Sequence, residues 1–145
     1  MIHMTDEMGH WLEIAPDDGV PCLVGTATKD GKPQISPKGS LALFDPETLS
    51  FWERTFRSSY EAIEENAQVV VYMRNPKRPE ITHRGNTLRF HGVARIATSE
   101  ADRERAFQLS SKREQERDPE KKGVAILIRV DMIEDLGGTV VQKRD

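Results

Sequence analysis

The chain has 145 residues, of which 37% are hydrophobic and 31% charged, and its formal net charge is −3. This length predicts one domain over residues 1–145 with a modest core, and the acidic balance argues against nucleic-acid binding as the main function. No apolar run approaches the roughly 20 residues of a membrane span, and no signal peptide is visible, so we expect a cytoplasmic protein without a membrane partner. The single cysteine, Cys22, predicts a core residue in a reducing compartment.

The first predicted element is a helix within residues 1–18. Thr5 can cap it, and apolar side chains recur with helical spacing at Met8, Trp11 and Leu12. A Pro-Asp-Asp-Gly turn then ends the helix.

Three strands are predicted next, over residues 20–28, 33–44 and 49–55, and their succession predicts a meander. The first connection, Lys-Asp-Gly-Lys at residues 29–32, is typical of a hairpin with a type I′ turn. The middle strand is interrupted by Ser-Pro-Lys-Gly at residues 36–39. Central strands reject proline and are weakened by glycine. The interruption therefore indicates either an edge-strand bulge or a site where another molecule approaches the backbone.

A short helix is predicted to begin at Ser58, because Ser58 and Glu61 have the spacing of a capping box. Two more strands are predicted over residues 69–73 and 87–97, and Gly92 predicts a bulge in the second.

The segment 99–119 predicts one inserted helix, which Ser99 begins with Asp102 in the capping-box position. The final strand or strands are predicted over residues 124–131 and 132–141. Six or seven mostly antiparallel strands with short helices indicate a mainly β fold, a small closed or half-open barrel.

Most familiar catalytic motifs are missing from the chain. It has no GxxxxGK[ST] loop, no GxGxxG, no HExxH and no GxSxG. One cysteine and scattered histidines give no metal-ligand pattern, so no metal site is expected. The basic segment 74–95 leaves a nucleic-acid-binding barrel open, although an aromatic content of 6% provides few stacking platforms.

One cluster of polar residues could bind an anion. Lys38 lies on the interruption, Arg54 and Thr55 end the next strand, and Ser58 and Ser59 open the short helix. Amide groups at a helix start attract phosphate, and an arginine fork can complete the site. From these residues alone, a phosphate site and an ordinary capped helix beside surface bases remain equally open.

Four motifs, PQISPKG, LSFWERT, RSSYEAIEENAQVVVYM and TLRFHGVARI, resemble the pyridoxamine 5′-phosphate oxidase-like family of FMN-binding split β-barrels. The resemblance runs from about Pro21 to Val130. It implies a six- to seven-stranded antiparallel split barrel and a homodimer with the flavin site at the subunit interface. It also implies that the flavin phosphate lies at the start of the short helix, and that the ring lies along the interrupted strand.

The resemblance also implies a set of cofactor-binding residues, without indicating a catalytic one. Two departures argue against vitamin B6 chemistry: the helix starts with Arg-Ser-Ser where many oxidases have Ser-Arg-Lys, and the chain lacks their Arg-Leu-x-Pro tail. The implied cofactor-binding residues are Ser36, Pro37, Lys38, Gly39, Glu53, Arg54, Thr55, Arg57, Ser58 and Ser59, with Arg89 and His91 as candidates from the partner chain.

The expected function is that of an FMN-binding oxidoreductase acting on an unidentified small molecule. Two alternatives stay open: a non-catalytic flavin reservoir or sensor, and a relative that uses a deazaflavin or haem. Arg54 is expected to pair with the flavin phosphate.

Overall fold

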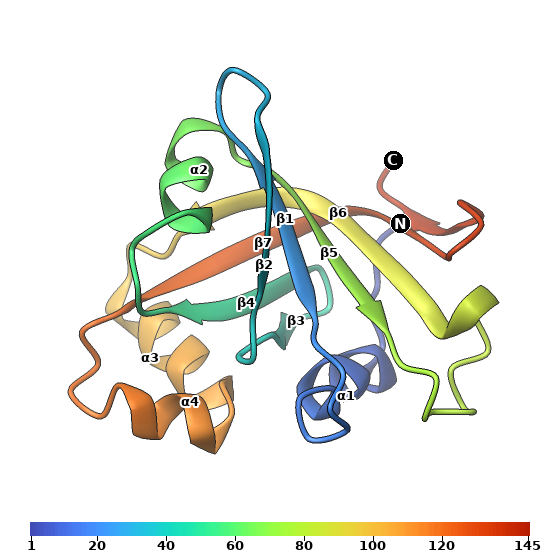
Figure 1. The fold of residues 1–145 in the computed structure, drawn as a ribbon, viewed down its shortest axis with the longest axis horizontal. Coiled ribbons are helices and arrows are strands. Elements are labelled where there is room, and N and C mark those ends of the chain that lie inside the picture. Colours follow the sequence, from blue (N-terminus) through green and yellow to red (C-terminus); the bar gives the residue numbers. More distant parts are fainter.

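Eight strands and four α-helices make up the structure, a computed structural model that describes residues 1–145 (Figure 1). In chain order the elements are α1 (Asp6–Ile14), β1 (Leu23–Ala27), β2 (Pro33–Pro37), β3 (Ala42–Asp45), β4 (Thr48–Glu53), α2 (Ser59–Glu65), β5 (Gln68–Arg74), the 3₁₀ turn η1 (Arg84–Asn86), β6 (Thr87–Ile96), α3 (Glu100–Leu109), α4 (Lys112–Arg117), β7 (Val124–Glu134) and β8 (Val140–Lys143). None of the helices has the length and apolar character needed to cross a membrane.

All the strands belong to one antiparallel sheet with the order β2-β1-β5-β6-β7-β4-β3, and β8 pairs with β7. The two edge strands, β2 and β3, follow one another directly along the chain. The sheet therefore curls so that one stretch of chain reaches both edges, without ladder pairing between them. The predicted mainly β split barrel is confirmed.

The predicted meander is wrong, because the middle strand divides into β2 and β3 at residues 38–41. Lys38 N still donates to Cys22 O at 2.9 Å and so continues the pairing with β1. Two residues later, Ser40 Oγ accepts from Trp52 N at 3.0 Å and donates to Trp52 O at 3.3 Å. The serine side chain thus replaces a backbone partner of β4 at the corner where the chain changes edges.

The hairpin between β1 and β2 is confirmed, but its turn is not type I′. That turn needs positive φ at both central residues, whereas Gly31 has φ 83° and Asp30 is not among the residues with positive φ. Thr28 N donates to Lys32 O at 3.0 Å and closes a three-residue loop. A single left-handed glycine after a tight turn is the usual form of such a loop.

Two of the predicted helix caps are confirmed, and one is wrong. Thr5 accepts from Met8 N at 3.2 Å, and Ser99 accepts from Asp102 N at 3.1 Å. Ser58 precedes α2 but makes no capping bond. A capping residue needs extended backbone to turn its hydroxyl back onto the helix, and Ser58 instead has φ 43° and ψ −96°.

The inserted segment holds two helices rather than the predicted single helix. Ser110 is extended, with φ −68° and ψ 157°, and this ends α3. Ser111 then accepts from Glu114 N at 3.3 Å and begins α4. Serine hydroxyls compete with the helical backbone for hydrogen bonds, so two serines in succession divide the helix. Asp118 follows α4 as its C-cap, as the predicted stop requires.

The long strand β6 has its predicted bulge, where the register with β7 shifts between His91 and Gly92. A Cβ added to Gly92 would lie 2.3 Å from Arg129 O. The absence of a side chain therefore allows the two strands to approach at the bulge. Of the predicted one or two final strands the structure has two, but β7 runs unbroken over Val124–Glu134, so the boundary between them lies later than residue 131.

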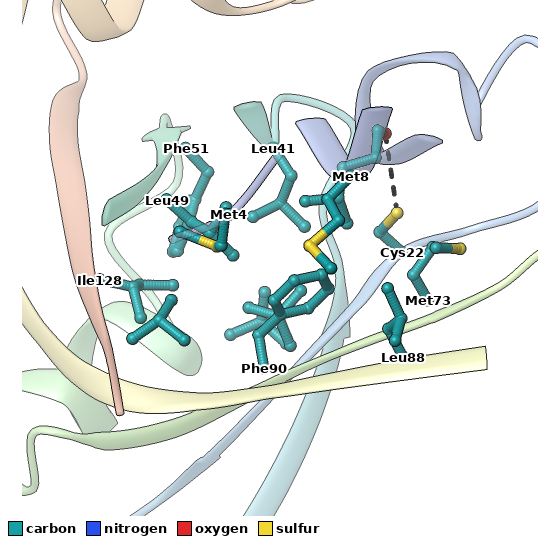
Figure 2. Close-up of a cluster of buried hydrophobic side chains, with 14 of the residues drawn as sticks. Met4, Met8, Cys22, Leu41, Leu49, Phe51, Met73, Leu88, Phe90 and Ile128 are labelled. Atoms are coloured by element: carbon teal, nitrogen blue, oxygen red, sulfur yellow. Dashed lines mark hydrogen bonds between the residues drawn. The ribbon is translucent and has the colours of Figure 1, made fainter. Parts of the chain in front are cut away.

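The main core lies between α1 and the concave side of the sheet (Figure 2). Met8 and Leu12 of α1 pack with Phe90 of β6 and Ile128 of β7, all buried. A smaller core under α3 contains Trp52 and other buried apolar residues of β3, β4 and β7. Full burial of one such apolar side chain stabilises the folded state by roughly 1.5–3 kcal/mol. The buried residues of α1 therefore hold this helix firmly beneath the interrupted strand.

Candidate functional site

The interruption places Lys38 against β4. Lys38 Nζ donates to Glu53 Oε2 at 2.8 Å, and the two side chains are only 14% and 1% exposed. Thr55 N and Oγ1 donate to the other Glu53 oxygen at 3.3 and 2.9 Å. The ammonium also lies 5.4 Å from the centre of the Phe51 ring. Lys38 and Glu53 therefore balance each other's charge within the protein.

Helix α4 brings a buried carboxylate to the same place. Glu114 Oε2 accepts from Arg54 Nε at 3.2 Å, and Glu114 Oε1 lies 3.4 Å from a terminal nitrogen of Arg117. A Cβ added to Gly39 would lie 3.1 Å from Glu114 Oε1. Gly39 thus leaves room for α4 to pack on the interruption. The terminal nitrogens of Arg54 have no hydrogen-bond partner within the protein.

Asp118 fixes the end of α4 to the sheet. Its carboxylate accepts from Trp52 Nε1 at 2.8 Å, Lys122 N at 2.9 Å and Gly123 N at 2.8 Å. Burial alone would raise the pKa of Asp118, but these three hydrogen bonds and the charge of Arg54 outweigh it, so the pKa lies below its usual value. The ionised carboxylate is therefore a structural anchor for this wall of the site.

These elements enclose a pocket of about 470 Å³, within the range of small-molecule sites. A second hollow of about 260 Å³ lies beside it and shares Pro16 and residues 37–39 with it. The interrupted backbone therefore borders both hollows, where a ligand could approach it. The larger pocket is lined by Glu13, Pro16 and Asp17 near α1, by residues 37–40, by residues 52–55, and by residues 111–114 with Arg117 around α4.

The loop after β4 presents several backbone donors. The amides of Phe56, Arg57, Ser58 and Ser59 have no acceptor within the protein, and neither has the Arg57 guanidinium. Phe56 and Ser58 have φ 55° and 43°, which is the sparsely populated left-handed region for such residues. Successive amides in unusual conformations can form a concave anion site. Together with the free guanidinium, this loop can accept an anionic group.

Six of the sequence-predicted site residues line the larger pocket: Pro37, Lys38, Gly39, Glu53, Arg54 and Thr55. Arg57 and Ser59 follow in the adjacent loop and the first turn of α2, and Ser58 lines a third hollow of about 180 Å³ beside α2. Ser36 lies on β2 outside the pocket, where its hydroxyl accepts from Gln34 Nε2 at 2.7 Å.

Arg89 and His91 do not join this group within one subunit. Arg89 donates to Asp135 O at 3.0 Å, and His91 Nε2 lies 2.8 Å from Glu134 Oε1. These contacts lie at the opposite end of β7 from Glu53, because Glu53 pairs with the first residue of β7 and Arg89 with the last. Eleven residues of β7 correspond to roughly 30–35 Å.

The sequence reasoning missed the walls contributed by α1 and α4. The stretch Ser-Lys-Arg-Glu-Gln-Glu-Arg at residues 111–117 has no apolar side chain, although it forms a helix. A helix without an apolar face cannot be held by hydrophobic burial, so polar contacts must hold it. The sequence signal that could have been used is the absence of apolar residues in this segment, because it indicates that polar side chains such as Glu114 make the contacts with the rest of the chain.

The side chains of Cys22 and the acidic residues do not gather into a metal site. No group of three His, Cys, Asp or Glu side chains is placed to hold a metal ion. Cys22 is buried, and its thiol donates to Leu12 O at 3.7 Å (Figure 2). Burial raises the pKa of this thiol to about 12, so it stays protonated at neutral pH and is not a nucleophile.

The structure is a split β-barrel with a pocket beside the corner where the chain changes edges. The family model described as pyridoxamine 5′-phosphate oxidase matches residues 10–135, and the chain belongs to this family. A comparison with curated protein sequences gave no match.

Solved structures give the same fold. HupZ from Group A Streptococcus is 26% identical, with a TM-score of 0.70 over 96% of this chain and 99% of its own. HutZ, the heme storage protein from Vibrio cholerae, is 15% identical, with a TM-score of 0.63 over 94% and 97%. A structure named F420 reductase is 20% identical, with a TM-score of 0.57 over 79% and 88%.

Proposed function

We propose that the protein is an FMN-binding oxidoreductase that acts on a small molecule. The observation that carries the proposal is the loop over residues 54–59, where four amides and the Arg57 guanidinium have no partner within the protein. Unpaired donors of this kind suit a phosphate group, which carries about −1.5 to −2 charges near neutral pH and three acceptor oxygens.

The cofactor phosphate would be held by this loop, with the terminal nitrogens of Arg54 close by along the chain. The ring would lie along residues 36–39, because the backbone of residues 37–39 borders both hollows. Lys38 would shape this surface rather than add net charge to it, because Glu53 already neutralises it. When bound, FMN supplies hydride transfer at its N5 atom, while the protein orients the reactants and excludes water.

The same proposal includes a homodimer. Ile35, Gly25, Val70, His91 and Met132 stand side by side across five strands. Ile35 is 67% exposed, and four of the five residues of this row are uncharged and carry no hydrogen-bonding side chain. A second copy of the chain would cover such a row and bring Arg89 and His91 to the partner's site. Light scattering at micromolar concentration tests this, and a monomer that still binds FMN would contradict it.

Two of the similar structures are named for other cofactors, one for heme storage and the other for F420. Haem and a deazaflavin are therefore the alternative cofactors to test. Neither of the two proteins is similar enough in sequence to transfer its ligand. The visible spectrum of the purified protein, and titration with FMN, a deazaflavin and haem, separates the three. Turnover with a reduced nicotinamide then separates an oxidoreductase from a flavin reservoir.

The sharpest test is the change Arg57→Ala. FMN affinity should fall about tenfold, because an exposed charge-assisted contact is worth about 1.4 kcal/mol, at the low end for charged groups. Riboflavin, which lacks the phosphate, should bind as before. Arg74→Ala is the matched control, since Arg74 is also exposed and has no ion pair. An equal loss for both ligands would contradict the proposed role of the loop.

A further inference from the structure

The charged residues of the larger pocket fall into two groups. On its floor, Lys38 is paired with Glu53, and Glu114 lies between Arg54 and Arg117. These three cations and two carboxylates pair with one another and together carry a net charge of +1. The pocket's other charged side chains are the ones whose full charge is available to a ligand.

The remaining charged residues stand on two walls of opposite sign. Lys112 and Arg113 belong to the α4 wall, and Glu13 and Asp17 belong to the α1 wall. All four are exposed, and none forms an ion pair within 4.0 Å. Two cations and two carboxylates that line one pocket without pairing are separated by the space between them.

The carboxyl of Glu13 is partly buried. This partial burial raises its pKa, while nearby His10 and the Leu43 amide partly offset the effect. A partly desolvated carboxylate gains more from a cationic partner than a fully hydrated one does. The α1 wall therefore favours a ligand that brings a positive charge.

The geometry points to a zwitterionic small molecule as the ligand of this pocket, with its anionic group at Lys112 and Arg113 and its ammonium group at Glu13 and Asp17. A molecule with only one of the two charges satisfies one wall and leaves the other without a partner. As the substrate class of the enzyme, this inference rests on the proposed function, because the flavin ring would lie along residues 36–39, of which residues 37–39 also line this pocket.

Binding can be measured with probes that differ only in charge. We would titrate 4-aminobutyrate and 6-aminohexanoate into the protein, with and without FMN, by calorimetry. Hexylamine and hexanoate carry one charge each on a chain of the same length as 6-aminohexanoate. The better zwitterion should bind at least about tenfold more tightly than either, because one added charge-assisted contact contributes about that factor.

Two double variants identify the walls. Lys112→Gln with Arg113→Gln should remove the advantage of the zwitterion over hexylamine, and Glu13→Gln with Asp17→Asn should remove its advantage over hexanoate. Arg74→Gln with Arg95→Gln is the control for the first double variant, because it also removes two positive charges, but from exposed arginines outside the pocket.

The outcomes separate this inference from the proposed function. Zwitterion selectivity that each wall variant removes supports the inference, whether or not FMN binds. FMN binding without any preference for the zwitterions would overturn the inference and leave the cofactor proposal standing. Selectivity that survives both wall variants would also overturn it, because the charges would then act elsewhere.

Discussion

Replacing Lys38 with methionine tests whether this lysine holds the corner of the barrel together. Glu53 is 1% exposed, and Lys38 Nζ at 2.8 Å is its only cationic partner. Removing one member of a buried ion pair costs about 3–5 kcal/mol. Lys38 is 14% exposed, and Thr55 still donates two hydrogen bonds to the carboxylate. We therefore expect a loss of about 2–3 kcal/mol, at or below the lower end of that range.

The assay is thermal and urea unfolding at pH 7 of four proteins: the wild type, Lys38→Met, Glu53→Gln and the double variant. At about 4 °C for each kcal/mol, Tm should fall by roughly 10 °C in Lys38→Met. Methionine keeps most of the side-chain volume over Phe51, so the loss reports the charge. The double variant should be more stable than Lys38→Met, because a neutral glutamine does not need the ammonium group.

Two results would refute this reasoning. One is a Lys38→Met protein with unchanged Tm and weakened FMN affinity, which would make Lys38 a cofactor ligand without a structural role. The other is a double variant whose loss equals the sum of the two single losses, because coupled residues must depart from additivity.

Three further predictions follow from the buried groups. Cys22 should not react with a thiol reagent in the native protein at pH 8 and should react fully in urea, because its pKa is raised to about 12. The pKa of Asp118 is lowered in the folded protein, so its contribution to stability is present above pH ~4 and lost as the pH falls through the lowered value. The stability difference between wild type and Asp118→Asn should therefore shrink from pH 6 to pH 3 in urea titrations. Gly92→Ala should cost about 2–3 kcal/mol in the same assay, because its Cβ would overlap Arg129 O.

Local signals in the sequence predicted local structure well. Thr5 and Ser99 cap their helices, and Gly92 lies at a bulge. Each of these features could be predicted because it depends on residues that are close together in the sequence. The Ser58 cap failed although its spacing to Glu61 was suitable. The preceding loop gives Ser58 a left-handed backbone, and no spacing rule contains that information.

Strand partners could not be predicted from local signals. The chain order 20–28, 33–44, 49–55 favoured a meander, but the middle strand divides, and its halves β2 and β3 lie on opposite edges of the sheet. Which strands pair depends on how the whole sheet is buried against one core, and residues from the entire chain determine this. For the same reason, the contact of Glu114 with Arg54, 60 residues apart, was not visible in the sequence.

The interruption at residues 36–39 links the topology of the barrel to its pocket. Because β2 and β3 lie on opposite edges of the sheet, the chain must leave one ladder at Lys38 and join the other at Ser40. Neither ladder can cover the backbone between these two residues, so the turn stays accessible from the adjacent hollows. A corner without pairing on either side needs other support, and the Lys38–Glu53 pair and α4 provide it. The site therefore lies where the topology leaves backbone accessible, and the charged residues that stabilise the corner also form the floor of the pocket.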